Sequence, residues 1–192
     1  GGTGIDIIGH SIYCVNVGGE DNDISGAGRS VINGGKNNLI KGSNAANIGG
    51  GQNNVIRNGF NSTIGGGDRN IISGSLLSAS VIAGGLNNRI LGSDVSYNFI
   101  GAGATNKIDG TSQGSTIAGG VSNLIRNANN SFAGAGNSIE IRGSDAVGLG
   151  NYSRVSDGHD GAFVFTDAIT TPVLSSGANT MVMKFKSGVF IN

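Results

Sequence analysis

The chain has 192 residues, of which 37 are glycine and one is proline, and its 12 lysines and arginines balance its 12 aspartates and glutamates. Glycine without a strict three-residue period and with almost no proline excludes a collagen triple helix. Plentiful isoleucine and valine at low charge argue against disorder, and zero net charge removes the main electrostatic argument for a nucleic-acid partner. Cys14 is alone, so no internal disulfide can form.

Residues 1–9, GGTGIDIIG, match the calcium-binding nonapeptide pattern. That pattern binds calcium only when tandem copies share their carboxylates, and the next nine residues, HSIYCVNVG, contain no aspartate. We therefore interpret residues 1–9 as the first coil of the repeat described next, and we predict no metal and no other cofactor. The chain begins on glycine, so we expect it to be a piece of a longer protein.

A repeat of 16 to 18 residues fills most of the chain, as in SVINGGKNNLIKGS at residues 30–43. Each copy has an apolar residue before a pair of small residues, except the first and weaker copy, which has Asn16 there. Six positions further on, every copy has an asparagine. These asparagines are Asn22, Asn38, Asn54, Asn70, Asn88, Asn106 and Asn123. Two positions after each asparagine lies an isoleucine, without exception. Such regularity indicates a true structural repeat.

Two positions after each isoleucine the chain holds only glycine or asparagine. These residues are Gly26, Gly42, Asn58, Gly74, Gly92, Gly110 and Asn127. Both residue types adopt a left-handed backbone cheaply, so we predict a turn in every copy. The preceding N-x-I segment has a period of two, which places its asparagine and isoleucine on one face of a strand.

Short identical strand-turn units cannot bury an apolar face alone and must stack. We therefore predict an all-β fold for residues 1–156: a β-solenoid or β-roll of stacked coils of 15–18 residues. Stacking would place the isoleucines in an inner column. It would also form the asparagines into a structural ladder whose amides bond to one another along the axis.

The small-residue pairs need a separate explanation, because glycine weakens a strand and usually marks a bend or a close backbone approach. They fall at residues 18–19, 34–35, 50–51, 66–67, 84–85, 102–103 and 119–120. The opposite face of the strands is also partly apolar, for example at Val31, Val55 and Val81. Close approach and a second apolar stripe together suggest that several chains pack around one axis.

One outward column follows the inner isoleucines and is about half basic. Its cations are Lys41, Arg57, Arg126 and Arg142. Two interpretations remain open: a solvated edge that discourages strand pairing, or a surface-contact strip for an anionic glycan.

From residue 157 the pattern changes. Residues 181–186 alternate Met and Phe with Val and Lys, and we predict an antiparallel strand paired with residues 162–166. Residues 157–192 would then form a C-terminal β-hairpin cap, which a solenoid needs. Asp157, His159 and Asp160 crowd one loop and could hold a metal, but a polar turn is the preferred interpretation.

Residues 8–156 resemble the head repeats of trimeric autotransporter adhesins and the β-roll segments of phage tail fibres. The resemblance rests on NSTIGGGDRNIISG, SVIAGGLNNRILG and DAVGLGNYSRVSDG. The end of the chain, with GAFVFTDA and ANTMVMKFKSGVFIN, is similar to the segment before the self-cleaving chaperone of many tail fibres and tailspikes. The resemblance implies a homotrimeric fibre in which residues 157–192 are a trimerisation segment, with Asn192 near such a junction.

We therefore expect a structural and binding protein: a trimeric fibre segment, on a virion or a cell surface, that presents a face to a host glycan or protein and performs no chemistry. A bacterial adhesin head is the alternative, and a polysaccharide-degrading tailspike is a third candidate. Paired carboxylates would be needed for that hydrolysis, and the few present are scattered through turns. No apolar run is long enough for membrane insertion.

Overall fold

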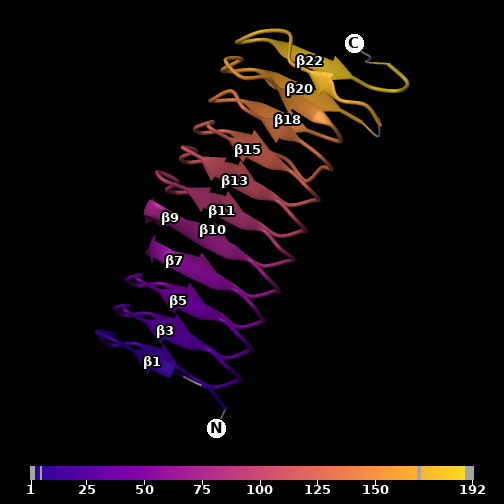
Figure 1. Cartoon of the computed structure of the whole chain (residues 1–192). Coiled ribbons are helices and arrows are strands. Elements are labelled where there is room, and N and C mark those ends of the chain that lie inside the picture. The colour runs from indigo at the N-terminus through magenta and orange to yellow at the C-terminus, as the bar shows by residue number, and fades with distance from the viewer. Residues whose placement is uncertain (1–2, 5, 168–169, 189–192) are drawn as a thin grey trace.

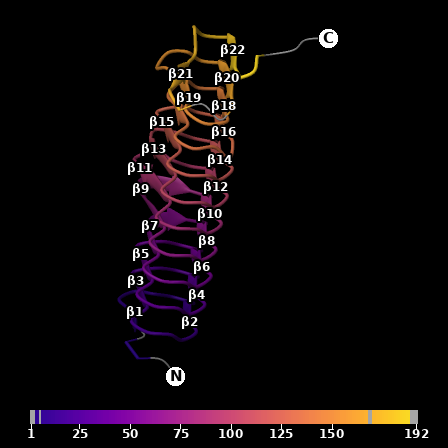
Figure 2. The ribbon, with the colours of Figure 1, turned by 90° about the vertical axis from the view of Figure 1, so that its right-hand side faces the viewer.

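The protein is an all-β parallel solenoid, described here from a computed structural model that covers residues 3–4, 6–167 and 170–188. Two sheets of eleven strands run the length of the molecule, one built from the odd-numbered strands and one from the even-numbered strands. Figure 1 shows the coils stacked along one axis from β1 to β22, and Figure 2 shows the two sheets facing each other. The described residues contain no helix long and apolar enough to cross a bilayer.

The odd sheet contains β1 (Asp6–Ile8), β3 (Asp23–Ser25), β5 (Leu39–Lys41), β7 (Val55–Phe60), β9 (Ile71–Ser78), β11 (Arg89–Gly92), β13 (Lys107–Gly110), β15 (Leu124–Arg126), β17 (Glu140–Ile141), β19 (Ser153–Val155) and β21 (Val173–Leu174). The even sheet contains β2 (Val15–Asn16), β4 (Val31–Ile32), β6 (Asn47–Ile48), β8 (Thr63–Ile64), β10 (Val81–Ile82), β12 (Phe99–Ile100), β14 (Thr116–Ile117), β16 (Phe132–Ala133), β18 (Val147–Leu149), β20 (Phe163–Thr166) and β22 (Met181–Lys184).

The register places like residues over like, which confirms the predicted solenoid. In the odd sheet Ile40 pairs with Ile56 and Ile56 with Ile72, and in the even sheet Ile48 pairs with Ile64. Both isoleucine columns point into the space between the sheets and are fully buried. The fully buried isoleucines are Ile24, Ile32, Ile40, Ile48, Ile56, Ile64, Ile72, Ile82, Ile90, Ile100, Ile108, Ile117, Ile125, Ile139 and Ile141.

The predicted left-handed turn is present at Gly26, Gly42, Asn58, Gly110 and Asn127. It is absent at Gly74, where β9 continues to Ser78. Gly92 also ends a strand with a nearly extended φ of 159°. The two coils concerned are the 18-residue ones. In the first of them β9 continues past the expected turn, and its pairing with β7 has a register shift at Arg57/Gly59.

The prediction for the C-terminal strand is right about the partner and wrong about the direction. Residues 181–184 pair with residues 163–166, but the pairing is parallel, so no hairpin forms. The chain between the two strands makes a further turn that includes β21, which adds to the odd sheet beside β19. Because the chain travels once around the solenoid before it returns, it arrives in the same direction. The last four residues of the expected segment lie outside the described part of the chain.

Candidate functional site

The asparagine column forms a hydrogen-bonded ladder inside the turns, with a different pattern from the one expected. The Asn70 amide nitrogen donates to the carbonyl oxygens of Gly66 and Gly85, both at 2.9 Å, and its amide oxygen accepts the backbone N–H of Asn88 at 2.9 Å. The same three bonds recur along the column, whereas a direct amide-to-amide bond links Asn38 to Asn22. Each asparagine thus satisfies backbone groups that the small-residue turn would leave buried and unpaired.

A second polar ladder, which the sequence interpretation missed, lies just before the even strands. The Ser30 hydroxyl accepts the backbone N–H of Ala46, the Asn98 amide oxygen accepts that of Ser115, and the Ser131 hydroxyl accepts that of Ala146. Different coils have serine, alanine or asparagine at this position, so no single residue type identifies the column in the sequence. The signal in the sequence is a recurrent small residue directly before each outward strand residue.

Three cations of the predicted surface-contact strip, Lys41, Arg57 and Arg126, lie in strands of the odd sheet, where Lys41 pairs with Arg57. Arg142 directly follows β17. The two ends of the strip differ in charge. Arg126 makes a bidentate ion pair with Asp109, both contacts at 2.8 Å, and Arg142 contacts Glu140 at 2.6 Å. For Lys41 and Arg57 the structure shows no ion pair with any described carboxylate. The four residues therefore form no continuous basic strip, and their role in glycan contact stays a prediction.

Asp109 is the charged centre of this outer face. Burial of its carboxyl by itself raises the pKa, but hydrogen bonds from Arg126 and Lys107 outweigh the burial, so the pKa of Asp109 lies below its ordinary value. The same contact raises the pKa of Arg126. Asp109 therefore links Lys107, on its own strand β13, to Arg126 on the neighbouring strand β15.

The lowered pKa predicts an acid-dependent contribution to stability. A carboxyl with a depressed pKa in the folded state stabilises fully above the unfolded value of about 3.9, and this contribution is lost as the pH falls towards the folded value. We expect Asp109→Asn to lower the free energy of unfolding by about 1 kcal/mol at neutral pH. Urea titrations of both proteins between neutral pH and pH about 3 should show that difference shrinking below pH about 4. A pH-independent difference would contradict the assignment.

The loop at residues 157–160 is a polar turn in the structure. His159 Nδ1 lies 2.7 Å from the Ser175 hydroxyl, and Asp160 accepts the backbone N–H of Ser144 at 2.7 Å. Within the described part of the chain, no group of three or more His, Cys, Asp or Glu side chains is placed to hold a metal. Residues 1, 2 and 5 of the nonapeptide fall outside the described residues.

The outer face of the even sheet carries no charged residue among its described outward positions, unlike the odd sheet. Its central column consists of Val15, Val31, Asn47, Thr63, Val81, Phe99, Thr116, Phe132, Val147, Phe163 and Met181. Several of these side chains are substantially exposed, including Val15 at 50%, Phe99 at 40% and Met181 at 60%. We call this surface the uncharged face. It extends without a break over all eleven strands.

The glycine pairs beside the uncharged face divide into two kinds. A Cβ on the second glycine, such as Gly67, would overlap the backbone of Gly85 in the next coil, so stacking within one chain requires glycine there. A Cβ on the first glycine would meet open space: the nearest atom is 4.0 Å away at Gly66 and 3.9 Å away at Gly84. Packing within the chain therefore explains only the second glycine of each pair, which corrects the attribution of both to contacts between chains.

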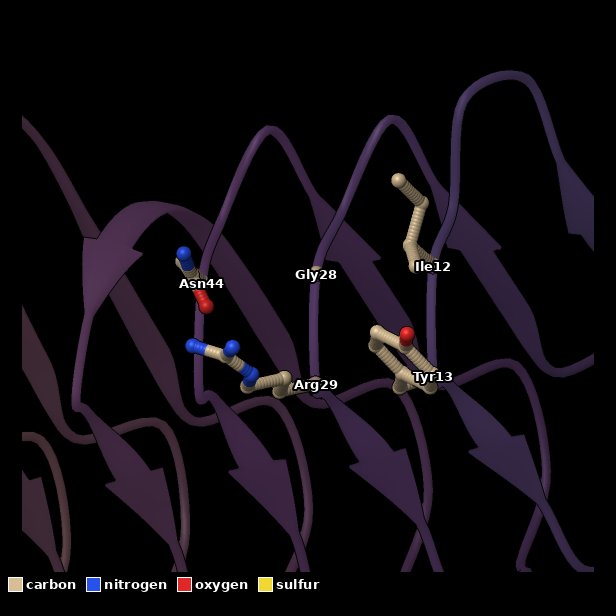
Figure 3. Close-up of a pocket in the computed structure, with 5 residues that line it drawn as sticks. All are labelled: Ile12, Tyr13, Gly28, Arg29 and Asn44. Carbon is tan, nitrogen blue, oxygen red and sulfur yellow. The ribbon is translucent and has the colours of Figure 1, made fainter.

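A notch lies on the opposite edge of the solenoid, between the end of the odd strands and the start of the even strands. It has a volume of about 230 Å³ and is lined by Ile12, Tyr13, Gly28, Arg29 and Asn44. Figure 3 shows Ile12 and Tyr13 on one side and Arg29 and Asn44 on the other, with bare backbone at Gly28 between them. Sequence interpretation missed this group because its members come from three successive coils.

These features define a two-sided parallel β-solenoid with one charged and one uncharged outer face. No protein-family model matches the chain. A comparison with curated proteins also found no significant match.

Proposed function

We propose that the chain is a structural and binding segment of a homotrimeric fibre, exposed on a virion or a cell surface, that holds a receptor-contacting face away from its attachment point and performs no chemistry. The observation that carries this proposal is the uncharged face. Eight of the eleven residues in its central column are apolar, the exceptions being Asn47, Thr63 and Thr116, and exposed apolar surface that gathers on one face is typical of sites of association.

A second copy of the same chain is the partner that fits this face best. The exposed side chains repeat at the spacing of neighbouring strands, about 4.8 Å. A partner that buries the whole face must match that spacing along its full length. A second copy of the solenoid matches it because its strands have the same spacing. The first glycine of each pair lies just after an even strand. Because glycine has no side chain, the backbone of a second chain could closely approach the backbone of the first at this edge.

The trimeric state and the virion location come from the resemblance to tail-fibre and adhesin repeats. The repeat and the charge-free outer face are compatible with that resemblance. Three copies joined through their uncharged faces would turn the odd sheets outward. The unpaired cations Lys41 and Arg57 would then be accessible to an anionic receptor, whereas Arg126 and Arg142 are already neutralised within the chain.

A matched pair of substitutions tests the interface. Val81 on the even sheet and Val55 on the odd sheet are both outward, half-buried valines. Val81→Lys should disrupt the association, because it would bury an unpaired charge between chains, at a cost of several kcal/mol. Val55→Lys should leave the association intact. Native mass spectrometry should find trimer for the wild type and Val55→Lys, and monomer or dimer for Val81→Lys.

The two variants are expected to have similar circular dichroism, since each lysine can reach solvent from its single chain. A wild-type chain that is monomeric at micromolar concentration would refute the proposal. A Val81→Lys protein that remains fully trimeric would show that the uncharged face is not the interface.

A further inference from the structure

We infer that the notch formed by Ile12, Tyr13, Gly28, Arg29 and Asn44 binds a hexuronic acid unit, a pyranose ring that bears one carboxylate. The inference deepens the proposed function and rests on it, since it names a ligand class and a place on the receptor-presenting surface. The notch lies within a single chain, so the binding itself requires no second copy.

The notch exists because one position in a column of side chains is empty. Ile12, Gly28 and Asn44 occupy the same place in three successive coils and are joined by parallel bridges. Gly28 has no left-handed φ, and a Cβ added there would lie 3.4 Å from the nearest atom, Asn44 Oδ1. Neither backbone conformation nor packing therefore demands glycine at this position. The absence of a side chain at Gly28 leaves the open space between Ile12 and Asn44.

Two large side chains beside the notch are kept there at a conformational cost. Tyr13 and Arg29 have φ values of 59° and 48°, a left-handed region that bulky residues rarely adopt. Some coils carry a residue in this column that adopts the conformation cheaply, such as Asn61 or Gly114, and others carry Ala45, Ala79 or Tyr97. The Tyr13 side chain is also 79% exposed. The left-handed conformation recurs along this column, for example at Ala45 and Tyr97, so it belongs to the turn of the fold. What distinguishes Tyr13 is its place beside the empty position at Gly28.

The chemistry of the lining selects the ligand. The Tyr13 ring and the Ile12 side chain offer an apolar surface to the C–H face of a sugar ring. Arg29 pairs with no described carboxylate, and its planar guanidinium suits bidentate recognition of a carboxylate. The Asn44 amide makes no hydrogen bond to the described protein and can serve hydroxyl groups as donor and acceptor. Figure 3 shows the Arg29 side chain extending towards Asn44, on the far side of the notch from Ile12.

Saturation-transfer NMR on the full chain tests this inference with two matched pairs of sugars: galacturonic acid against galactose, and glucuronic acid against glucose. We expect transfer to the ring protons of at least one acid and several-fold less to its neutral counterpart. Gly28→Val should abolish the transfer, because it fills the notch, and Tyr13→Ala should reduce it several-fold. Arg29→Ala should reduce the signal of the acid to that of the neutral sugar.

Tyr97 provides the control for the tyrosine substitution. It lies in the same column as Tyr13, with a φ of 60° and 67% exposure, but away from the notch. Tyr97→Ala should bind the acid as the wild type does. The inference is overturned if neither acid receives transfer, if the acids and the neutral sugars bind the wild type equally, or if Tyr97→Ala loses as much signal as Tyr13→Ala.

Native mass spectra of the same samples separate this inference from the proposed function. A trimer that binds no uronic acid would contradict the notch alone. A monomer that binds uronic acid through the notch would contradict the proposed interface alone. Unchanged circular dichroism of Gly28→Val is expected, since the nearest atoms to the added Cβ belong to the Asn44 side chain, at 3.4 Å and beyond, and not to the backbone.

Discussion

Replacing Ile56 with aspartate should unfold the central coils of the solenoid. Ile56 is fully buried and is stacked between Ile40 and Ile72. An aspartate there would place a carboxylate among aliphatic side chains with no partner, which costs several kcal/mol even after protonation. We expect the melting temperature to fall by about 10 °C or more, since 1 kcal/mol corresponds to about 2–4 °C in a domain of this size.

The neighbouring residue supplies the control. Val55 precedes Ile56 in β7 and points outward, so Val55→Asp introduces the same charge in the same strand on the solvent side. Its effect should remain near 1 kcal/mol, typical of a half-buried surface position. Thermal melts followed by circular dichroism would compare the two. Equal losses of stability would contradict the assignment of inner and outer faces.

Replacing Gly67 with alanine should be nearly as damaging, whereas the same change at Gly66 should be tolerated. The added methyl group at Gly67 would overlap the carbonyl oxygen of Gly85, and the φ of 90° is itself unfavourable for alanine. Because the obstacle is the backbone of the next coil, no rotamer change can relieve it. Overpacking and backbone strain together should cost about 3 kcal/mol or more.

At Gly66 the same methyl group would meet its nearest atom at 4.0 Å, and Ala102 already carries a methyl group at the equivalent position in another coil. We expect a change within about 0.5 kcal/mol there, in line with unconstrained surface positions. Urea unfolding of the two variants provides the measurement. If Gly66→Ala is as unstable as Gly67→Ala, the division of the glycine pairs into two kinds is wrong.

The repeat in the sequence was sufficient to establish the parallel solenoid and its core. Isoleucine recurs two positions after asparagine in every copy, and a strand with period two must place both on one face. Identical short units can bury that face only by stacking, so Ile40, Ile56 and Ile72 had to lie over one another. The buried position of the asparagines follows from the same argument.

The partners of the asparagine amides depended on the tertiary structure. The amides bond to the carbonyls of the small-residue turn, such as Gly66 and Gly85, because stacking brings that backbone within 2.9 Å of the amide nitrogen. Sequence spacing specifies which residues share a column, but it does not specify the distances between columns.

The tertiary structure also decided what the surfaces can do. Opposite charges that are 17 residues apart in the chain, such as Asp109 and Arg126, become neighbours only when the coils stack. The same stacking separates a charged outer face from the uncharged face and brings Tyr13, Arg29 and Asn44 around the gap at Gly28. Periodicity within a coil determined which side chains point in. The contacts between outward side chains depend on the exact length and register of every coil, and these are set only when the whole stack forms.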